Sequence, residues 1–220
     1  MKAFLKLTLV SDATFGRGDG VPGLVDAEVE HDHNGLPYMH GRTLKGLLGE
    51  EGANILFTLG QFQPDLERWQ RAMLQLFGRP GSTEDGIANL HVGDARLPDD
   101  LRAAIAADLA SSSYTPADAL TALTSIRRQT AMDESGVPDE GSLRAMRVIL
   151  RGTPFVAALH FGQKPGEDDL ALLAACVKAL RRVGTGRNRG RGKVTAGLYT
   201  AQGEDVTGKH LAYFEKEVYP

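Results

Sequence analysis

Cysteine is nearly absent from this chain of 220 residues, which contains only Cys176. A single cysteine excludes an intrachain disulfide and a zinc site built from several thiolates, and it agrees with a cytoplasmic location. Long apolar runs are missing too, since no stretch approaches the ~20 residues that span a bilayer. Lys6 interrupts the apolar start of the chain, so we expect no signal peptide there. These absences predict a globular cytoplasmic protein without a membrane partner.

Acidic residues are missing from residues 170–203, although the whole chain has a net charge of −3. The basic residues in this stretch are Lys178, Arg181, Arg182, Arg187, Arg189, Arg191 and Lys193. The net charge argues against a uniformly basic nucleic-acid-binding protein. The local concentration of positive charge is nevertheless suited to a polyanion.

Hydrophobic periodicity divides the chain into strands and helices. Apolar residues alternate with polar ones over 3–9 and 155–161, which predicts half-buried strands, and they recur at helical spacing over 43–59 and 167–183. In chain order we expect strand 3–9, a flexible glycine-rich loop 11–23, helix 43–59, helix 64–77, strand 87–95, a short helix from 99, a helix capped at Thr115, a hairpin over 126–150, strand 155–161, helix 167–183 and strand 194–198. We expect Trp69 of the second helix in the core, and Leu101, Ile105 and Leu109 on the inner side of the helix that begins at 99. The positive charges of Arg181 and Arg182 match the negative end of helix 167–183.

The order of these elements predicts the fold class. Strand, helix, strand, strand, helix and strand follow one another, with further helices inserted between them. This order fits an α+β, ferredoxin-like (RRM-like) sandwich, whose open sheet face often carries RNA. The polar tip of segment 126–150 adds a projecting β-hairpin.

Two segments have the composition of phosphate-binding sites. At the predicted start of the first helix, backbone N–H groups lie beside Arg42 and Lys45, and we expect Thr43 to cap the helix. In segment 184–193, four glycines and four basic side chains alternate, which allows the backbone to lie against a ligand. Its glycine spacing excludes both a dinucleotide-binding fingerprint and a P-loop.

Carboxylates and histidines gather on the connection that leads into the first helix. Asp26 and Asp32 lie there, and Asn34-Gly35 predicts a tight turn. His31 and His33 flank Asp32, and with His40 they leave a divalent metal site open as an alternative. Nucleophilic catalysis lacks support, because no Gly-x-Ser-x-Gly occurs and Cys176 lies in a predicted helix.

Four segments of the chain resemble, in order, the motifs of a known family. They are Gly-Leu-Val-Asp26 followed by Gly35-Leu-Pro-Tyr and Gly41-Arg-Thr-Leu44-Lys45-Gly46; Leu90-His-Val-Gly-Asp94-Ala95; Asp133 with Gly136 and the basic strand to Leu150; and Arg189-Gly190-Arg-Gly192-Lys-Val194. This combination resembles the backbone subunits of type III CRISPR effector complexes, in the RAMP superfamily. The resemblance implies one RAMP-type RNA-binding domain over residues 1–220 with a thumb-like insertion at about 124–147.

The resemblance also implies a function. A subunit of this kind binds guide RNA (crRNA), stacks with other copies of itself in a filament and with other type III effector subunits, and cleaves complementary target RNA with Mg²⁺ or another divalent cation. Asp26 inherits the catalytic and metal-binding roles by position. The residues expected to hold RNA are Arg42, Thr43, Lys45, Arg127, Arg128, Gly186, Arg187, Arg189, Gly190, Arg191 and Lys193.

Departures from the family pattern leave two alternatives open. Ala27 follows Asp26 where the family often has asparagine, and the helix start differs as well, with His40-Gly-Arg42-Thr43 in place of Pro-Gly-Ser-Ser. One alternative is a non-catalytic RNA-binding scaffold subunit of the same complex. The other is a stand-alone, metal-independent RNA-processing endonuclease that uses a histidine such as His31 or His40.

Overall fold

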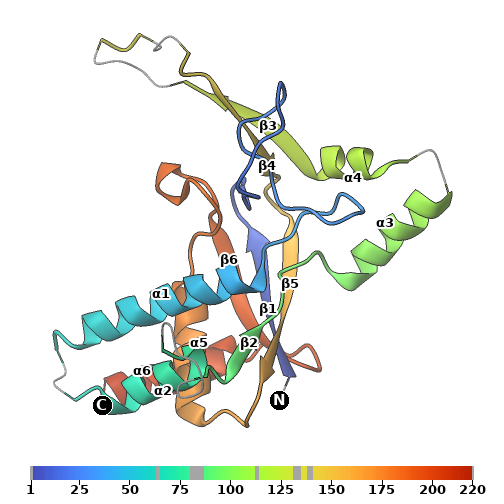
Figure 1. The fold of residues 1–220 in the computed structure, drawn as a ribbon. Helices are drawn as coiled ribbons and strands as arrows, with labels where there is room; N and C mark the ends of the chain where they lie inside the picture. Colours follow the sequence, from blue (N-terminus) through green and yellow to red (C-terminus); the bar gives the residue numbers. More distant parts are fainter. Residues whose placement is uncertain are drawn as a thin grey trace.

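A four-stranded antiparallel sheet lies at the centre of the computed structural model, which describes residues 2–62, 65–79, 87–111, 114–130, 135–137 and 141–219. Its strands, in spatial order, are β2 (Leu90–Val92), β5 (Pro154–Phe161), β1 (Lys2–Leu9) and β6 (Val194–Thr200) (Figure 1). The predicted alternation is confirmed, because Leu5 and Leu7 of β1 and Leu159 of β5 are buried while His160 is exposed.

Two helices cover the buried face of the sheet. These are α1 (Gly41–Leu59) and α5 (Glu167–Ala179), and Leu44 of the first and Leu172 of the second share one core with Leu5. Each helix connects two strands of the sheet. The expected α+β, ferredoxin-like fold is therefore confirmed.

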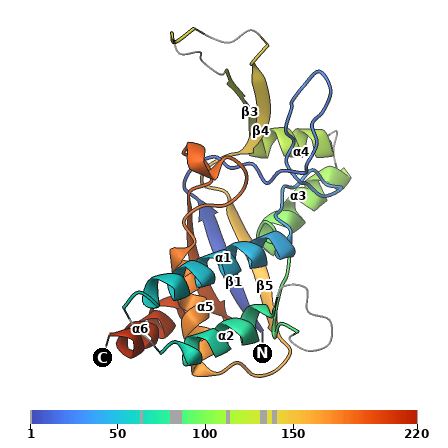
Figure 2. The same cartoon turned by 60° about the vertical axis from the view of Figure 1, so that its left-hand side comes forward.

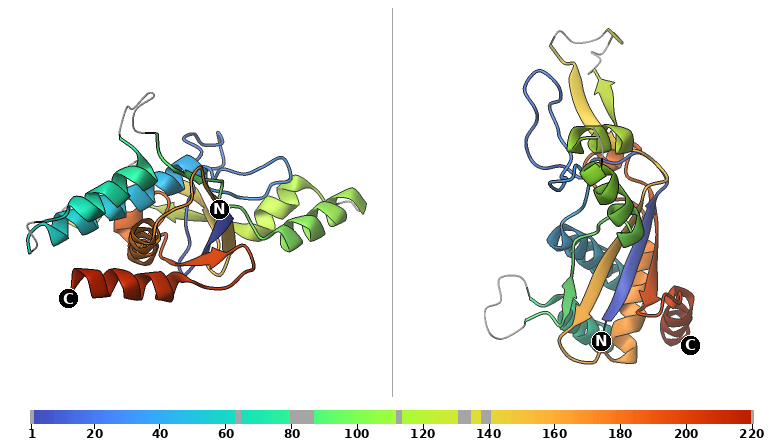
Figure 3. Two further views of the ribbon diagram at one scale, coloured as in Figure 1. Left: turned by 90° about the horizontal axis from the view of Figure 1, so that it is seen from below. Right: turned by 90° about the vertical axis from the view of Figure 1, so that its right-hand side faces the viewer.

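Two further helices extend this helical layer. In α2 (Glu67–Phe77), Trp69 is buried as expected, and its ring lies 4.6 Å from that of Phe214. Phe214 belongs to α6 (Thr207–Val218), which packs against α5 and follows the last strand (Figure 3). We did not expect α6, although Leu211, Phe214 and Val218 have helical spacing. Pro64, the expected start of α2, lies outside the described residues.

The insertion between β2 and β5 projects from one end of the sheet (Figures 1 and 2). It consists of α3 (Asp99–Ser111), α4 (Pro116–Leu123), β3 (Thr124–Gln129) and β4 (Arg144–Ile149). The last two form a separate antiparallel sheet, which confirms the expected hairpin, here called the thumb. Asp133 lies outside the described residues. The assignment of residues 1–220 to one domain stays a prediction.

Two expectations about helices α3 and α5 are wrong. Leu101 is exposed and no residue of α3 is fully buried, although Ile105 packs against the core as expected. Helix α5 ends at Ala179 because Leu180 is extended and residues 182–183 pair with 192–193 instead, so Arg182 does not match the end of a helix. Isolated bridges join the loop 11–23 to three other segments, and its expected flexibility stays a prediction.

Helix α1 begins at Gly41, and Thr43 does not cap it. The Gly41 N–H donates instead to Oδ1 of Asp94, 3.0 Å away, and Oδ2 of the same carboxylate accepts from Arg96 at 2.9 Å. Burial acts to raise the pKa of Asp94, but these hydrogen bonds and the Arg96 charge outweigh it and hold the pKa below its ordinary value of 3.8. The first N–H group of the helix thus donates to a carboxylate that is 53 residues away in the sequence.

Replacing Asp94 tests this cap. We expect Asp94→Ala to lower the free energy of unfolding at pH 7 by about 1 kcal/mol, as measured by urea titration. Because the pKa of folded Asp94 is depressed, its contribution is present above pH 3.8 and is lost as the pH falls through the folded pKa. The wild-type and variant stabilities should therefore converge in acid. Glu204→Ala, at an exposed loop residue, is the control, and an equal loss there would contradict the cap.

Candidate nucleic-acid interface

A short segment, residues 12–16, joins the thumb to the glycine-rich loop 184–193. On one side the backbone of Ala13 pairs with Ile149 of β4, with N–O distances of 3.1 and 2.7 Å. On the other side the carbonyl of Thr14 accepts from the N–H of Thr185 at 2.9 Å. The buried Thr14 hydroxyl also donates to the carbonyl of Arg147, at 2.9 Å. These contacts fix the base of the thumb and the glycine-rich loop side by side.

Glycine is required at both ends of the glycine-rich loop. Gly184 and Gly192 have φ values of 79° and 69°, and a Cβ would lie 2.5 Å from the Thr14 carbonyl oxygen and 1.9 Å from that of Val183. Between them, a short 3₁₀ turn, η1 (Arg187–Arg189), is flanked by left-handed glycines. The close approach of the backbone at both ends fixes where the loop begins and ends, and its arginines lie between these two points.

The arginines of the thumb and of the loop line two adjoining cavities of about 620 and 660 Å³, here called the thumb-loop groove. Gln129 and Arg191 line both cavities. The expected RNA-binding residues that the groove brings together are Arg127, Arg128, Gly186, Arg187, Arg189, Gly190 and Arg191, and Arg151 joins them. Their contact with RNA stays a prediction.

Positive charge in the groove is only partly neutralised. Arg127 pairs with Asp12 at 2.9 Å and Arg187 with Glu50 at 3.2 Å, both at the surface. Among the described residues, neither Arg128 nor Arg189 forms an ion pair. Partial burial, followed by the nearby Arg189 and Arg127 charges, lowers the pKa of Arg191. Arginines held this close favour an anionic partner, and arginine suits phosphate because of its forked donors.

Four expected RNA-binding residues lie outside the groove. Arg42 and Lys193 are exposed and line neither cavity, and burial lowers the pKa of the half-buried Lys45. Thr43 lines a smaller cavity next to Arg187. Since Asp94 occupies the N–H of Gly41, the start of α1 offers less to a phosphate than its sequence predicts.

Asp26 lies alongside the thumb strand β4, near the end of the strand that leads to the thumb tip. Its N–H and its Oδ2 both bond to the backbone of Ala145, each at 2.7 Å, and Ala27 forms a parallel bridge with Met146, which lines the groove. The Asp26 residue is exposed, and within the described ranges its carboxylate is bonded through Oδ2 alone. One such carboxylate fits Mg²⁺ only where RNA phosphates and water supply the other ligands.

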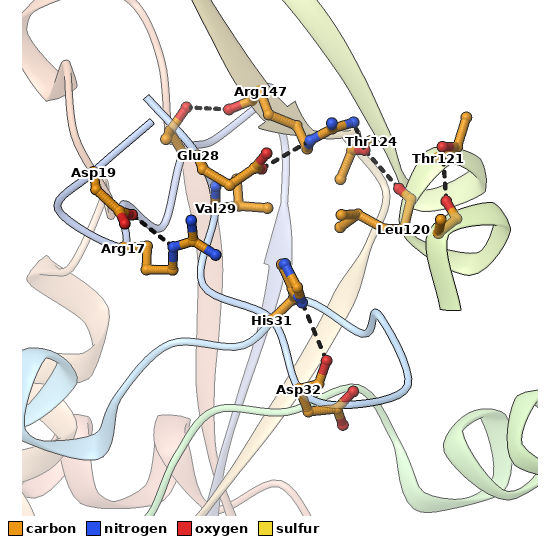
Figure 4. A network of polar contacts seen from close by, with 12 residues as sticks. Arg17, Asp19, Glu28, Val29, His31, Asp32, Leu120, Thr121, Thr124 and Arg147 are labelled. Atoms are coloured by element: carbon orange, nitrogen blue, oxygen red, sulfur yellow. Dashed lines mark hydrogen bonds and ion pairs between the residues drawn. The ribbon is translucent and has the colours of Figure 1, made fainter. Parts of the chain in front are cut away.

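A buried ion pair anchors the Asp26 segment to the thumb (Figure 4). Nε of Arg147 donates to Oε1 of Glu28 at 2.8 Å, and its Nη1 donates to the hydroxyl of Thr124 at 3.3 Å. Both charged side chains are nearly inaccessible, with 10% and 3% exposed. Sequence reasoning missed this pair because its members are 119 residues apart.

The loop with the histidines has a structural role. Oδ1 of Asp32 accepts from the N–H groups of Asn34 and Leu36, at 2.9 and 3.0 Å, and Gly35 has the positive φ expected of a tight turn. Nδ1 of His31 lies 3.1 Å from the Asp32 carbonyl oxygen (Figure 4). Across the described ranges, no group of three or more His, Cys, Asp or Glu residues is placed to hold a metal ion.

The sheet face opposite α1 and α5 is the other surface that the fold suggests for RNA. Phe4 of β1 lies beside Tyr199 of β6 on this face. Lys2 and Lys6 place their ammonium groups 5.2 and 4.3 Å from the centroids of these two rings. Both rings are thus engaged in cation–π contacts within the chain, and the thumb-loop groove is the better-supported interface.

The fold and the groove define a ferredoxin-like protein with an arginine-lined cleft at the base of a thumb. A sequence profile described as the RAMP superfamily matches residues 6–195, so this chain belongs to the RAMP superfamily. No curated protein shows a significant match to the chain. In the described ranges, no helix combines the length and the apolar character needed to cross a lipid bilayer.

Among the solved structures that share the fold are chains of a type III-B assembly. A chain from the cryo-EM structure of the Type III-B Cmr-beta bound to cognate target RNA is 13% identical, with a TM-score of 0.61, over 90% of this chain and 97% of that one. A chain from the Type III-B Cmr-beta in the apo state is 14% identical, with a TM-score of 0.62, over 92% and 98%. At such identities the likeness establishes the fold alone.

The Glu28–Arg147 pair yields a stability prediction. Arg147→Met leaves the Glu28 carboxylate buried without its partner, so we expect the free energy of unfolding to fall by about 3–5 kcal/mol in urea titrations. Arg127→Met, which breaks the exposed pair with Asp12, is the matched control and should cost less than about 1 kcal/mol. Equal losses in the two variants would show that the buried pair does not anchor the thumb.

Proposed function

We propose that this chain is a guide-RNA-binding backbone subunit of a type III CRISPR effector complex, and that it cleaves complementary target RNA beside Asp26. The thumb-loop groove is the observation that carries the proposal, because it offers arginine side chains and glycine backbone to a phosphate chain. Membership of the RAMP superfamily supports it, as does a fold shared with chains of a type III-B assembly, one of them bound to target RNA.

Asp26 has the chemistry for the cleavage step. Ala145 holds one of its oxygens, so the carboxylate has a fixed orientation next to a groove-lining strand. The other oxygen then accepts the proton of a 2′-hydroxyl group. Asp26 together with RNA phosphates would hold Mg²⁺, and a bound Mg²⁺ stabilises negative charge that develops on phosphate oxygens.

A scaffold subunit without cleavage activity is the second candidate. It is favoured by the lack, among the described residues, of any group of three or more His, Cys, Asp or Glu side chains placed to hold a metal ion. In both cases the partners would be guide RNA, target RNA, further copies of the chain in a filament and other effector subunits, in the cytoplasm. Sequencing the RNA that copurifies with the protein tests the guide-binding role, which requires short RNAs with a shared repeat-derived end.

The groove is tested by the salt dependence of RNA binding. We expect replacement of Arg187, Arg189 and Arg191 by alanine to weaken binding of single-stranded RNA and to reduce the slope of log K against log salt by about 2, since each lost phosphate contact removes about 0.7. Fluorescence anisotropy over a NaCl series measures both. The control replaces three exposed lysines remote from the groove: Lys164, Lys209 and Lys216. An unchanged slope in the groove variant would place the RNA elsewhere.

Catalysis is tested at Asp26 in the assembled complex. We expect Asp26→Ala to abolish Mg²⁺-dependent cutting of a labelled complementary RNA while the amount of bound guide RNA stays the same. Asp19→Ala, at an exposed carboxylate on the same connection, is the control and should cut normally. Cutting by the Asp26 variant would remove Asp26 from the mechanism, whereas an inert wild-type complex would favour the scaffold.

A further inference from the structure

A third cavity opens beside the thumb-loop groove and has a different character. It adjoins the groove at Gly184, Thr185 and Arg187, which line both spaces. Its volume is about 220 Å³. At roughly 30 Å³ for each water molecule, this is room for about seven waters, which matches one planar heterocycle and falls below the range of drug-sized ligand sites.

The walls of this cavity combine apolar groups with one carboxylate. Tyr38 and Leu47 supply apolar surface, and Glu30 is the acid that lines the space. Arg187 lines both the cavity and the groove, whereas Glu30 lines the cavity but not the groove. A phosphate in the groove and an uncharged ring in the cavity would therefore each meet a suitable environment.

Glu30 is held in place and still has capacity to accept hydrogen bonds. Its N–H donates to the Phe15 carbonyl at 2.7 Å, and its Oε1 accepts from the Tyr38 hydroxyl at 3.2 Å. Its Oε2 lies 3.6 Å from Nε2 of His40, which is beyond a good hydrogen bond. A carboxylate has about four acceptor sites, so Glu30 retains room for further N–H donors. Burial and the Glu30 charge raise the pKa of Tyr38, which keeps its phenol a donor.

The carboxylate selects among the four bases. Guanine presents two adjacent donors, N1–H and the N2 amino group, to the two oxygens of a carboxylate. Adenine and cytosine offer one amino group each. Uracil offers a single N–H between two carbonyl oxygens, which a carboxylate repels. Recognition of unstacked bases through their Watson–Crick edges is common in proteins that bind single-stranded RNA.

We infer that this cavity binds one unstacked guanine base of the RNA held in the thumb-loop groove, and that Glu30 is the residue that determines this specificity. The inference rests on the proposed function, because the groove must first hold the RNA. Arg187 contacts the phosphate next to the bound guanosine, and the base turns away from the groove into the cavity.

Short RNAs test the inference on the full chain. The probes are a fluorescent uridine heptamer and versions with guanosine, inosine, adenosine or cytidine at the centre, and anisotropy gives each Kd. We expect the guanosine heptamer to bind about tenfold more tightly than the uridine heptamer, since a bidentate contact discriminates by that order. Inosine lacks the 2-amino group, so it should lose most of the gain. This comparison needs no protein variant.

Two variants assign the effect to Glu30. Glu30→Gln should abolish the preference for guanosine while the uridine heptamer binds as before or slightly better. Glu50→Gln is the matched control, because it also removes one carboxylate charge near the cavity. Glu50 pairs with Arg187 but does not line the cavity, so this variant should keep the preference for guanosine. Salt-dependent binding of all five heptamers with equal affinity would overturn the inference and leave the proposed function standing. No binding of any heptamer would overturn both.

Discussion

The backbone pairing of residues 12–16 with two other segments is the interaction on which the rest of the interface depends. Ala13 pairs with Ile149 of the thumb, and the next residue, Thr14, bonds to Thr185 of the glycine-rich loop. One short segment therefore fixes the thumb and the loop, which lie far apart in the chain. The arginines of the groove belong to these two structures. The shared segment therefore sets how close these two groups of arginines lie and how far their charge is concentrated.

Charge placement explains how an acidic protein can present a binding surface for a polyanion. The net charge is −3, yet arginines from the thumb and from residues 187–191 converge on one cleft. Asp12 is the acidic residue among its described lining, and it is paired with Arg127. At physiological ionic strength the field of distant acids is screened beyond about 8 Å. The local surroundings of the groove therefore decide what it attracts, and the charge of the whole molecule decides little.

The sequence was informative where a local pattern determines structure. Alternation predicted β1 and β5, the Thr115 capping box is present as expected, and the basic character of 184–193 was evident. Long-range contacts were not predictable in this way. The sequence indicated Arg127 and Arg189 as separate RNA-binding candidates, but their common groove depends on the pairing of residues 12–16 with the thumb and the loop. Neither the Asp94 cap nor the Glu28–Arg147 pair leaves a periodic signal in the sequence. Helix α6 had a readable pattern and was overlooked.

The connection between Thr14 and Thr185 spans 171 positions of the chain. During synthesis, residues 12–16 therefore lack their second partner until the glycine-rich loop has left the ribosome. Contacts of such separation form late, because the entropy of closing the loop must be overcome before they add any stability. The groove is thus completed only after residues 184–193 have been made, and a nascent chain that lacks them presents no finished surface to passing RNA.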